Sequence, residues 1–102
     1  MSEVRAAALA DLEPECPLAV TLNGTRVALV RVGESVHALG DVCPHQGGPL
    51  SEGRLVGGRL ACPWHGWRYD VRTGDCVMPT RGGPVPSYPV RVANGDVWVD
   101  VP

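Results

Sequence analysis

Short segments of the chain alternate apolar and polar residues, which is the pattern of β-strands that bury one face. These segments are rich in valine and are separated by turn signals such as Asn23-Gly24 and Asn94-Gly95, which favour tight hairpins. The pattern predicts strands at residues 19–22, 26–32, 35–39, 59–62, 67–71, 75–77, 88–92 and 96–101. So many short strands with turns between them predict an all-β fold, a small antiparallel β sandwich or barrel.

One segment departs from this pattern. Residues 4–12, VRAAALADL, could form a helical turn, which Pro14 would end. With 102 residues and no linker or low-complexity segment, the chain is expected to form a single domain. The loops between residues 41 and 94 are long enough to carry a functional site on top of the strands.

The composition narrows the class of protein. Thirteen glycines and ten prolines favour turns over helices. A net charge of −2 gives no basic surface, so no nucleic-acid partner is expected. The sequence shows no signal peptide and no run of about 18 apolar residues, so we expect a soluble cytoplasmic protein with no membrane partner. In the cytoplasm thiols stay reduced, and paired cysteines bind metals more often than they form disulfides.

Two loops carry similar sets of potential metal ligands. The stretches DVCPHQGGPL and LACPWHGWRY each hold a cysteine, a proline directly after it, and a histidine. They contain Cys43-x-His45 and, after sixteen residues, Cys62-x-x-His65. Each loop therefore supplies one thiolate and one imidazole, and two loops that face each other would offer four ligands.

The residues alone leave two kinds of metal site open. A Cys2His2 set can hold one structural zinc, although zinc fingers usually group the cysteines together and the histidines together. Loops that mix the two ligand types also suit two irons, one bound by both cysteines and the other by both histidines. Pro44 and Pro63 fix φ beside each cysteine, and Gly47 and Gly66 allow tight turns, so both loops should be stiff.

With its four ligands in register, the chain resembles the Rieske-type [2Fe–2S] ferredoxins. The segment CPWHGWRYDVRTGDC is similar to the second cluster loop of that family and the hairpin behind it, and GGPVPSYPVRV is similar to its proline loop and return strand. The resemblance implies the Rieske fold, with a basal β part at about residues 1–40 and 80–102 and a cluster-binding part at about residues 41–79. It also implies one [2Fe–2S] cluster bound by Cys43, His45, Cys62 and His65.

The resemblance places five further residues near the cluster. Gln46 and Pro84 are expected either to help exclude water or only to shape their loops, while Trp64 could shield the cluster, lie on a docking surface or simply pack. The respiratory relatives brace the cluster with a disulfide and carry a serine at the position of Trp67, and this chain has neither. Its reduction potential is therefore expected towards the low end of the family range of about −150 to +300 mV. Tyr69 matches a tyrosine that bonds to sulfur in those relatives, so its hydroxyl either reaches a sulfur or faces water.

The remaining cysteines and histidine limit what the chain can do alone. Cys16 and Cys76 are expected to be small buried or half-buried residues rather than ligands. His37 lies in a predicted strand, so the chain cannot build the two-histidine, one-carboxylate iron site of a Rieske oxygenase. No G-x-G occurs that could bind a dinucleotide. The chain is therefore expected to carry electrons and not to be an enzyme.

Among Rieske proteins the resemblance is strongest to the soluble ferredoxin components of bacterial multicomponent aromatic-ring dioxygenases. It implies a monomeric one-electron carrier between an NAD(P)H-dependent flavoprotein reductase and a terminal oxygenase. The small Rieske-like subunit of an assimilatory nitrite reductase is the alternative, for which we expect a stable complex with a large sirohaem subunit. A zinc interaction module, the third reading, would be colourless.

Overall fold

The computed structural model describes residues 2–43, 47–64, 66–78 and 83–102. Its strands are β1 (Ser2–Ala8), β2 (Leu18–Leu22), β3 (Thr25–Val32), β4 (Ser35–Gly40), β5 (Arg54–Val56), β6 (Arg59–Ala61), β7 (Arg68–Asp70), β8 (Cys76–Met78), β9 (Ser87–Tyr88), β10 (Val90–Ala93) and β11 (Asp96–Val101). Short 3₁₀ helices are η1 (Leu9–Asp11) and η2 (Leu50–Glu52). No helix in the described part of the chain is long and apolar enough to cross a membrane.

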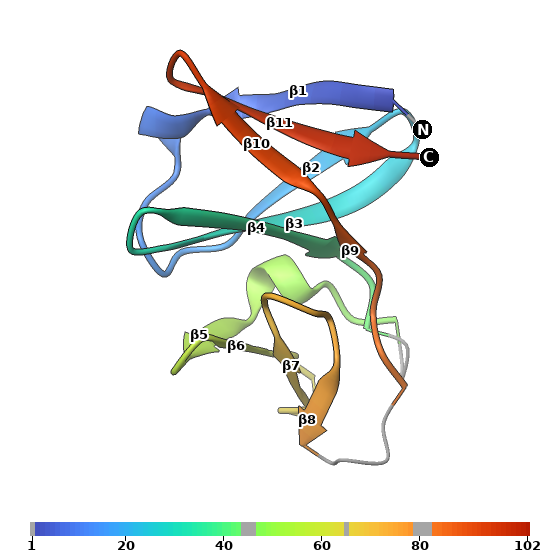
Figure 1. The fold of residues 1–102 in the computed structure, drawn as a ribbon. Helices are drawn as coiled ribbons and strands as arrows, with labels where there is room; N and C mark the ends of the chain where they lie inside the picture. Colours follow the sequence, from blue (N-terminus) through green and yellow to red (C-terminus); the bar gives the residue numbers. More distant parts are fainter. Residues whose placement is uncertain (1, 44–46, 65, 79–82) are drawn as a thin grey trace.

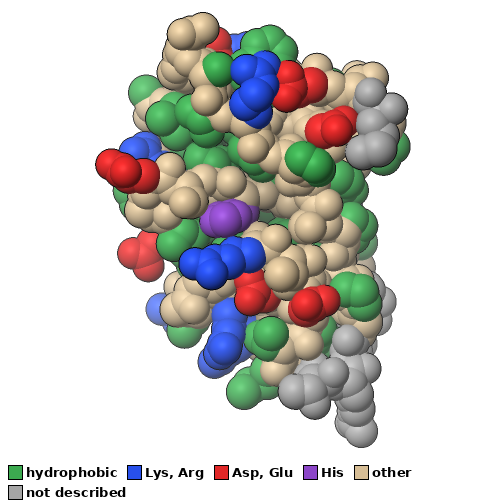
Figure 2. Space-filling model, in the orientation of Figure 1, with side chains coloured by type: hydrophobic (Ala, Val, Ile, Leu, Met, Phe, Trp, Pro, Cys, Tyr) green, Lys and Arg blue, Asp and Glu red, His purple; other side chains and the backbone are tan. Residues whose placement is uncertain are grey.

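The described strands form three antiparallel sheets, with the orders β1-β11-β10, β2-β3-β4-β9 and β5-β6-β7-β8. In Figure 1 the sheet of β2, β3 and β4 lies between the other two. The antiparallel all-β class predicted from the sequence is confirmed. On the face shown in Figure 2, basic and acidic side chains are interspersed among apolar ones.

Strand β3 serves two hydrophobic cores at once. Val27 and Leu29 point into the core shared with β11, whereas Ala28 and Val30 point into the core that also contains the loop cysteines. All four side chains are fully buried, which explains why this strand reads as a continuous apolar run and not as an alternation. The predicted boundary between a basal part at about residues 1–40 and 80–102 and a cluster-binding part at about residues 41–79 stays a prediction.

The predicted hairpin turns rest on paired positive φ angles. Asn23 and Gly24 have φ of +50° and +80°, and Asn94 and Gly95 have φ of +54° and +78°. A type I′ turn needs φ above zero at both central residues, and asparagine followed by glycine accepts this at the lowest cost. The β2–β3 and β10–β11 hairpins therefore form as the sequence predicts.

The predicted helical turn at residues 4–12 is mostly wrong. Its first half belongs to β1, which pairs with β11 from Ser2 opposite Val101 to Ala8 opposite Asp96, and only η1 is helical. Alanine-rich sequence favours a helix locally, but pairing with β11 and burial of Ala7 in the core outweigh that preference.

The predicted strand at residues 88–92 is also corrected. Pro89 divides it into β9, which pairs with β4, and β10, which pairs with β11. Proline has no N–H to donate to a sheet, so the chain leaves one sheet and enters the next at this residue. The sequence reasoning missed β5, a strand of three residues that pairs with β6.

Candidate metal centre

The first candidate ligand loop closes on itself around Cys43. The Cys43 N–H donates a hydrogen bond of 2.8 Å to the Gly48 carbonyl, and the Cys43 carbonyl accepts one of 2.7 Å from the Gly47 N–H. Gly47 has φ of +76°, in the left-handed region that favours glycine, so the predicted tight turn is confirmed. The predicted residues His45 and Gln46 of this loop lie outside the described residues.

The second loop repeats this turn. The Cys62 N–H donates to the Trp67 carbonyl at 2.7 Å, the Gly66 N–H donates to the Cys62 carbonyl at 2.9 Å, and Gly66 has φ of +73°. The shared sequence signal is C-P-x-x-G, in which the glycine stands four residues after the cysteine. Each cysteine therefore sits at the equivalent point of the same backbone turn. His65 lies outside the described residues.

The two loops pack against each other at Gly48. A Cβ atom placed on Gly48 would lie 3.3 Å from the Cys62 Sγ and 2.9 Å from the Trp64 Cδ2. Cys43 and Cys62 are 1% and 2% exposed and belong to the same core. The fold thus brings the two predicted cysteine ligands into one buried site, and glycine at position 48 leaves room for both neighbours.

Tyr69 reaches this site from β7. Its ring is fully buried, and its Oη lies 3.3 Å from the Cys43 Sγ. Burial, and then the hydrogen bond to Cys43 and the charge of the nearby thiols, raise the pKa of Tyr69 well above its usual value. The hydroxyl therefore keeps its proton and is the donor whenever Cys43 is a thiolate. Of the two orientations that the sequence left open, the structure has the one in which the hydroxyl reaches a sulfur.

The other expected neighbours differ in exposure. Trp67 is partly buried and packs against the core of the cysteines, whereas Trp64 is 56% exposed although one edge of its ring covers Gly48. Pro84 is exposed, and its neighbour Val85, which sequence reasoning missed, is the residue of this segment that enters the core. A single valine between prolines gives no periodic signal that could have identified it.

The two cysteines outside the loops differ from each other. Cys76 is buried in the core beside Tyr69, as predicted. Cys16 is exposed, so the prediction that it is buried or half-buried is wrong. It lies in the turn between η1 and β2, where the chain runs over the surface before the strand begins.

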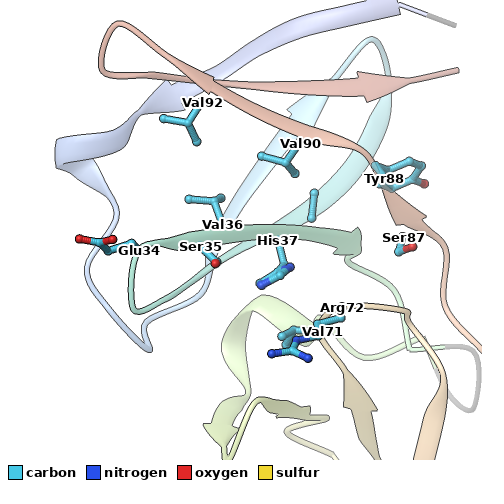
Figure 3. A pocket seen from close by; sticks show the side chains of 11 residues that line it. Glu34, Ser35, Val36, His37, Val71, Arg72, Ser87, Tyr88, Val90 and Val92 are labelled. Atoms are coloured by element: carbon cyan, nitrogen blue, oxygen red, sulfur yellow. The ribbon is translucent and has the colours of Figure 1, made fainter.

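His37 lies in β4 opposite Val30, as its strand pattern predicts. It points towards Val71 and Arg72 (Figure 3) and borders a surface hollow of about 390 Å³ that also contains Ser35. Burial, followed by the positive charge of Arg72, lowers the pKa of His37. Of the predicted ligands that the structure describes, neither Cys43 nor Cys62 lines this hollow.

The donor set at the cysteines fits a metal centre. Thiols buried in an apolar core resist ionisation, and a bound metal cation makes the thiolate form stable there. Within the described residues no group of three or more histidine, cysteine, aspartate or glutamate side chains could hold a metal ion, and both predicted histidine ligands lie outside them. Cys43 and Cys62 are thus the two predicted ligands that lie within the described residues.

Comparisons with known proteins agree with this reading of the loops. Residues 2–89 match the Rieske [2Fe-2S] domain. The chain is 33% identical over 98 residues to the ferredoxin component of the naphthalene 1,2-dioxygenase system of Pseudomonas putida, with 96% of this chain and 94% of that protein covered.

Solved structures show the same likeness in three dimensions. The ferredoxin of carbazole 1,9a-dioxygenase from Nocardioides aromaticivorans IC177 superposes with a TM-score of 0.92 at 35% identity, over 97% of each chain. A Mycobacterium tuberculosis protein named as a "putative NADH-dependent nitrite reductase small subunit" superposes with a TM-score of 0.87 at 33% identity, over 96% of this chain and 93% of that one. The matched domain, the paired loops and the buried cysteines show that this chain belongs to the Rieske [2Fe–2S] family and carries one Rieske-type [2Fe–2S] cluster.

Proposed function

We propose that the chain is a cytoplasmic one-electron carrier of a multicomponent oxygenase system. It takes electrons from an NAD(P)H-dependent flavoprotein reductase and passes them to a terminal oxygenase of the aromatic-ring dioxygenase type. The observation that carries this proposal is the likeness, along nearly the whole of both chains, to ferredoxin components of dioxygenase systems.

The proposed ligands are Cys43 and Cys62 for one iron and His45 and His65 for the other. When bound, such a cluster takes up and releases a single electron. Each described ligand comes from a turn closed by two backbone hydrogen bonds and lies in a packed core. The loops would therefore keep one geometry in both oxidation states, and electron transfer would require little rearrangement of the protein.

The alternative proposal is the small subunit of an assimilatory nitrite reductase, and the TM-score of 0.87 to such a protein favours it. The two roles differ in how the chain meets its partner. A carrier binds its reductase and its oxygenase in turn and releases both, whereas a subunit stays bound to one large sirohaem protein. Size-exclusion chromatography after co-expression with each partner distinguishes the two.

The metal content tests the first step of the proposal. The purified protein is expected to be red-brown, with two irons and two acid-labile sulfides per chain. Its reduced form is expected to give a rhombic EPR signal with an average g below 2, because imidazole donates less electron density to iron than thiolate does. One zinc and no sulfide would end the cluster assignment.

A pair of cysteine variants tests the ligand assignment. Cys43→Ser is expected to lose the visible absorption of the cluster, since Cys43 is a proposed ligand. Cys16→Ser is the matched control, because this cysteine is exposed and lies outside both loops, and it should keep the full cluster content. Equal cluster content in the two variants would contradict the assignment.

Electron transfer to partners then tests the function itself. The reduced protein is mixed in a stopped-flow instrument with an oxidised aromatic-ring oxygenase, and the loss of the reduced spectrum is followed. Substrate oxidation driven by NAD(P)H should require reductase, this chain and oxygenase together. A chain that is reduced and oxidised only within a stable sirohaem complex would support the nitrite reductase alternative.

A further inference from the structure

Asp41 is a buried carboxylate at the base of the first ligand loop, two residues before Cys43. Its residue is 2% exposed, and among the described residues it is the charged side chain that the fold buries. An ionised group is expensive to bury unless it is paired and hydrogen-bonded. A carboxylate kept at this position therefore needs a reason.

The Asp41 carboxylate is held by two hydrogen bonds and one ion pair. Its Oδ1 accepts a hydrogen bond of 2.6 Å from the Ser51 N–H, and its Oδ2 accepts one of 2.9 Å from the Ser51 Oγ. The Arg26 Nη2 lies 3.7 Å from the same Oδ2. The backbone is fixed as well, because the Asp41 N–H donates to the Arg26 carbonyl at 3.1 Å and the Leu50 N–H donates to the Asp41 carbonyl at 3.1 Å.

These bonds close the neck of the ligand loop. Beyond Asp41 and its partners, Val42 bridges to Pro49 in antiparallel fashion, and the Cys43 N–H donates to Gly48. The two ends of the loop are thus tied together in successive pairs that lead to the Cys43 thiol. Because the carboxylate clamps Ser51 at the outer end of this ladder, it fixes the direction from which Cys43 enters the site.

The charge of Asp41 is only partly neutralised. Its side chain is 3% exposed, whereas the side chain of Arg26 is 53% exposed. Water therefore screens the guanidinium far more than the carboxylate, and the interior side of the pair is net negative. Asp41 stands two residues before Cys43, so the Cα atoms of the two residues lie at most about 7 Å apart. A charge anchored this near to a ligand acts on the site through the Coulomb interaction.

We propose that Asp41 is the positioning residue of the metal centre, which holds Cys43 in place through the loop neck and lowers the reduction potential through its buried charge. A fixed negative charge makes the addition of an electron less favourable, and net charge is one of the properties that set Fe–S potentials. The proposal rests on the cluster and not on the proposed partners. The role of Asp41 can therefore fail while the carrier function stands, and the carrier function can fail while the role of Asp41 stands.

The test compares reduction potentials of four variants by protein-film voltammetry. Asp41→Asn keeps the shape and an acceptor for the Ser51 N–H but removes the charge. It should increase the equilibrium constant for one-electron reduction about threefold to tenfold. This corresponds to a reduction potential higher by about 28–59 mV, at 59 mV per tenfold change. Glu52→Gln is the control, because it removes an exposed, water-screened carboxylate next to Ser51 and should shift the potential much less.

Arg26→Gln supplies the opposite sign. It removes the cation and leaves the carboxylate, so the potential should fall, but by less than Asp41→Asn raises it, because water screens the exposed guanidinium. This variant carries the test if Asp41→Asn does not fold. Ser51→Ala keeps the charge but loses one hydrogen bond, so it should lose the visible absorption faster than wild type under a chelator while its potential changes little.

Two results would overturn the proposal. The charge role fails if Asp41→Asn shifts the potential no more than Glu52→Gln, or, where that variant does not fold, if Arg26→Gln does not lower the potential. The positioning role fails if Ser51→Ala and, where it folds, Asp41→Asn retain the cluster as long as the wild type.

Discussion

Removal of one hydroxyl group tests the environment of the cluster most directly. In Tyr69→Phe the ring keeps its place in the core, and only the donor 3.3 Å from the Cys43 Sγ is lost. The raised pKa of Tyr69 means that the wild-type hydroxyl is protonated across the working pH range. The substitution therefore removes a hydrogen bond and leaves the charge of the protein unchanged.

The expected shift follows from the change in charge on reduction. The centre becomes more negative when it gains an electron, so the bond from Tyr69 stabilises the reduced form more than the oxidised form. A difference of about 0.5–1.5 kcal/mol is reasonable for one bond to a charged acceptor. Since about 59 mV corresponds to 1.4 kcal/mol in a one-electron couple, the potential of Tyr69→Phe should be about 20–60 mV lower than that of wild type.

Protein-film voltammetry of the two proteins at one pH measures this shift. The chain offers a matched control in Tyr88→Phe, because Tyr88 is partly buried in β9 and packs against the other core, so its hydroxyl is not at the cysteines. The control should leave the potential unchanged. A shift of Tyr69→Phe under about 10 mV, or a rise, is incompatible with a bond that favours the reduced form.

Two further substitutions test packing and pH dependence. Gly48→Ala places a Cβ 2.9 Å from the Trp64 ring, so it should speed the loss of visible absorption under a chelator severalfold. The control Gly83→Ala meets nothing within 4 Å and should not change this rate. Equal rates in the two variants would contradict the packing of the loops. His37 has a lowered pKa, through burial and then the charge of Arg72, so its unfolded form binds protons more readily and stability is lost as the pH falls below about 6.5. Urea unfolding at pH 5.5 and 7.5 should show a smaller pH dependence for His37→Gln than for wild type, and an unchanged dependence would mean that His37 does not contribute.

Much of the protein could be predicted from local sequence signals. The Asn-Gly turns and the valine-rich segments predicted most of the strands, because turn geometry and side-chain alternation depend on residues close together in the chain. The C-x-H and C-x-x-H pattern of the two loops carried the resemblance to the family, because each pattern lies within a few neighbouring residues. The turns that hold the two cysteines are local as well, since each is closed by bonds between residues at most five apart. Cys43 and Cys62 lie buried in one core, while all four ligand assignments stay a prediction.

The tertiary structure decided what depends on contacts between distant segments. Residues 2–8 became a strand because β11, near the other end of the chain, offers an edge with which to pair. The Tyr69 hydroxyl meets Cys43 across 26 residues, and the Asp41 carboxylate meets Ser51 across the ligand loop. Periodicity shows that a residue is buried or exposed but not which partner it faces, because the partner is set by how the sheets stack and in which register they pair.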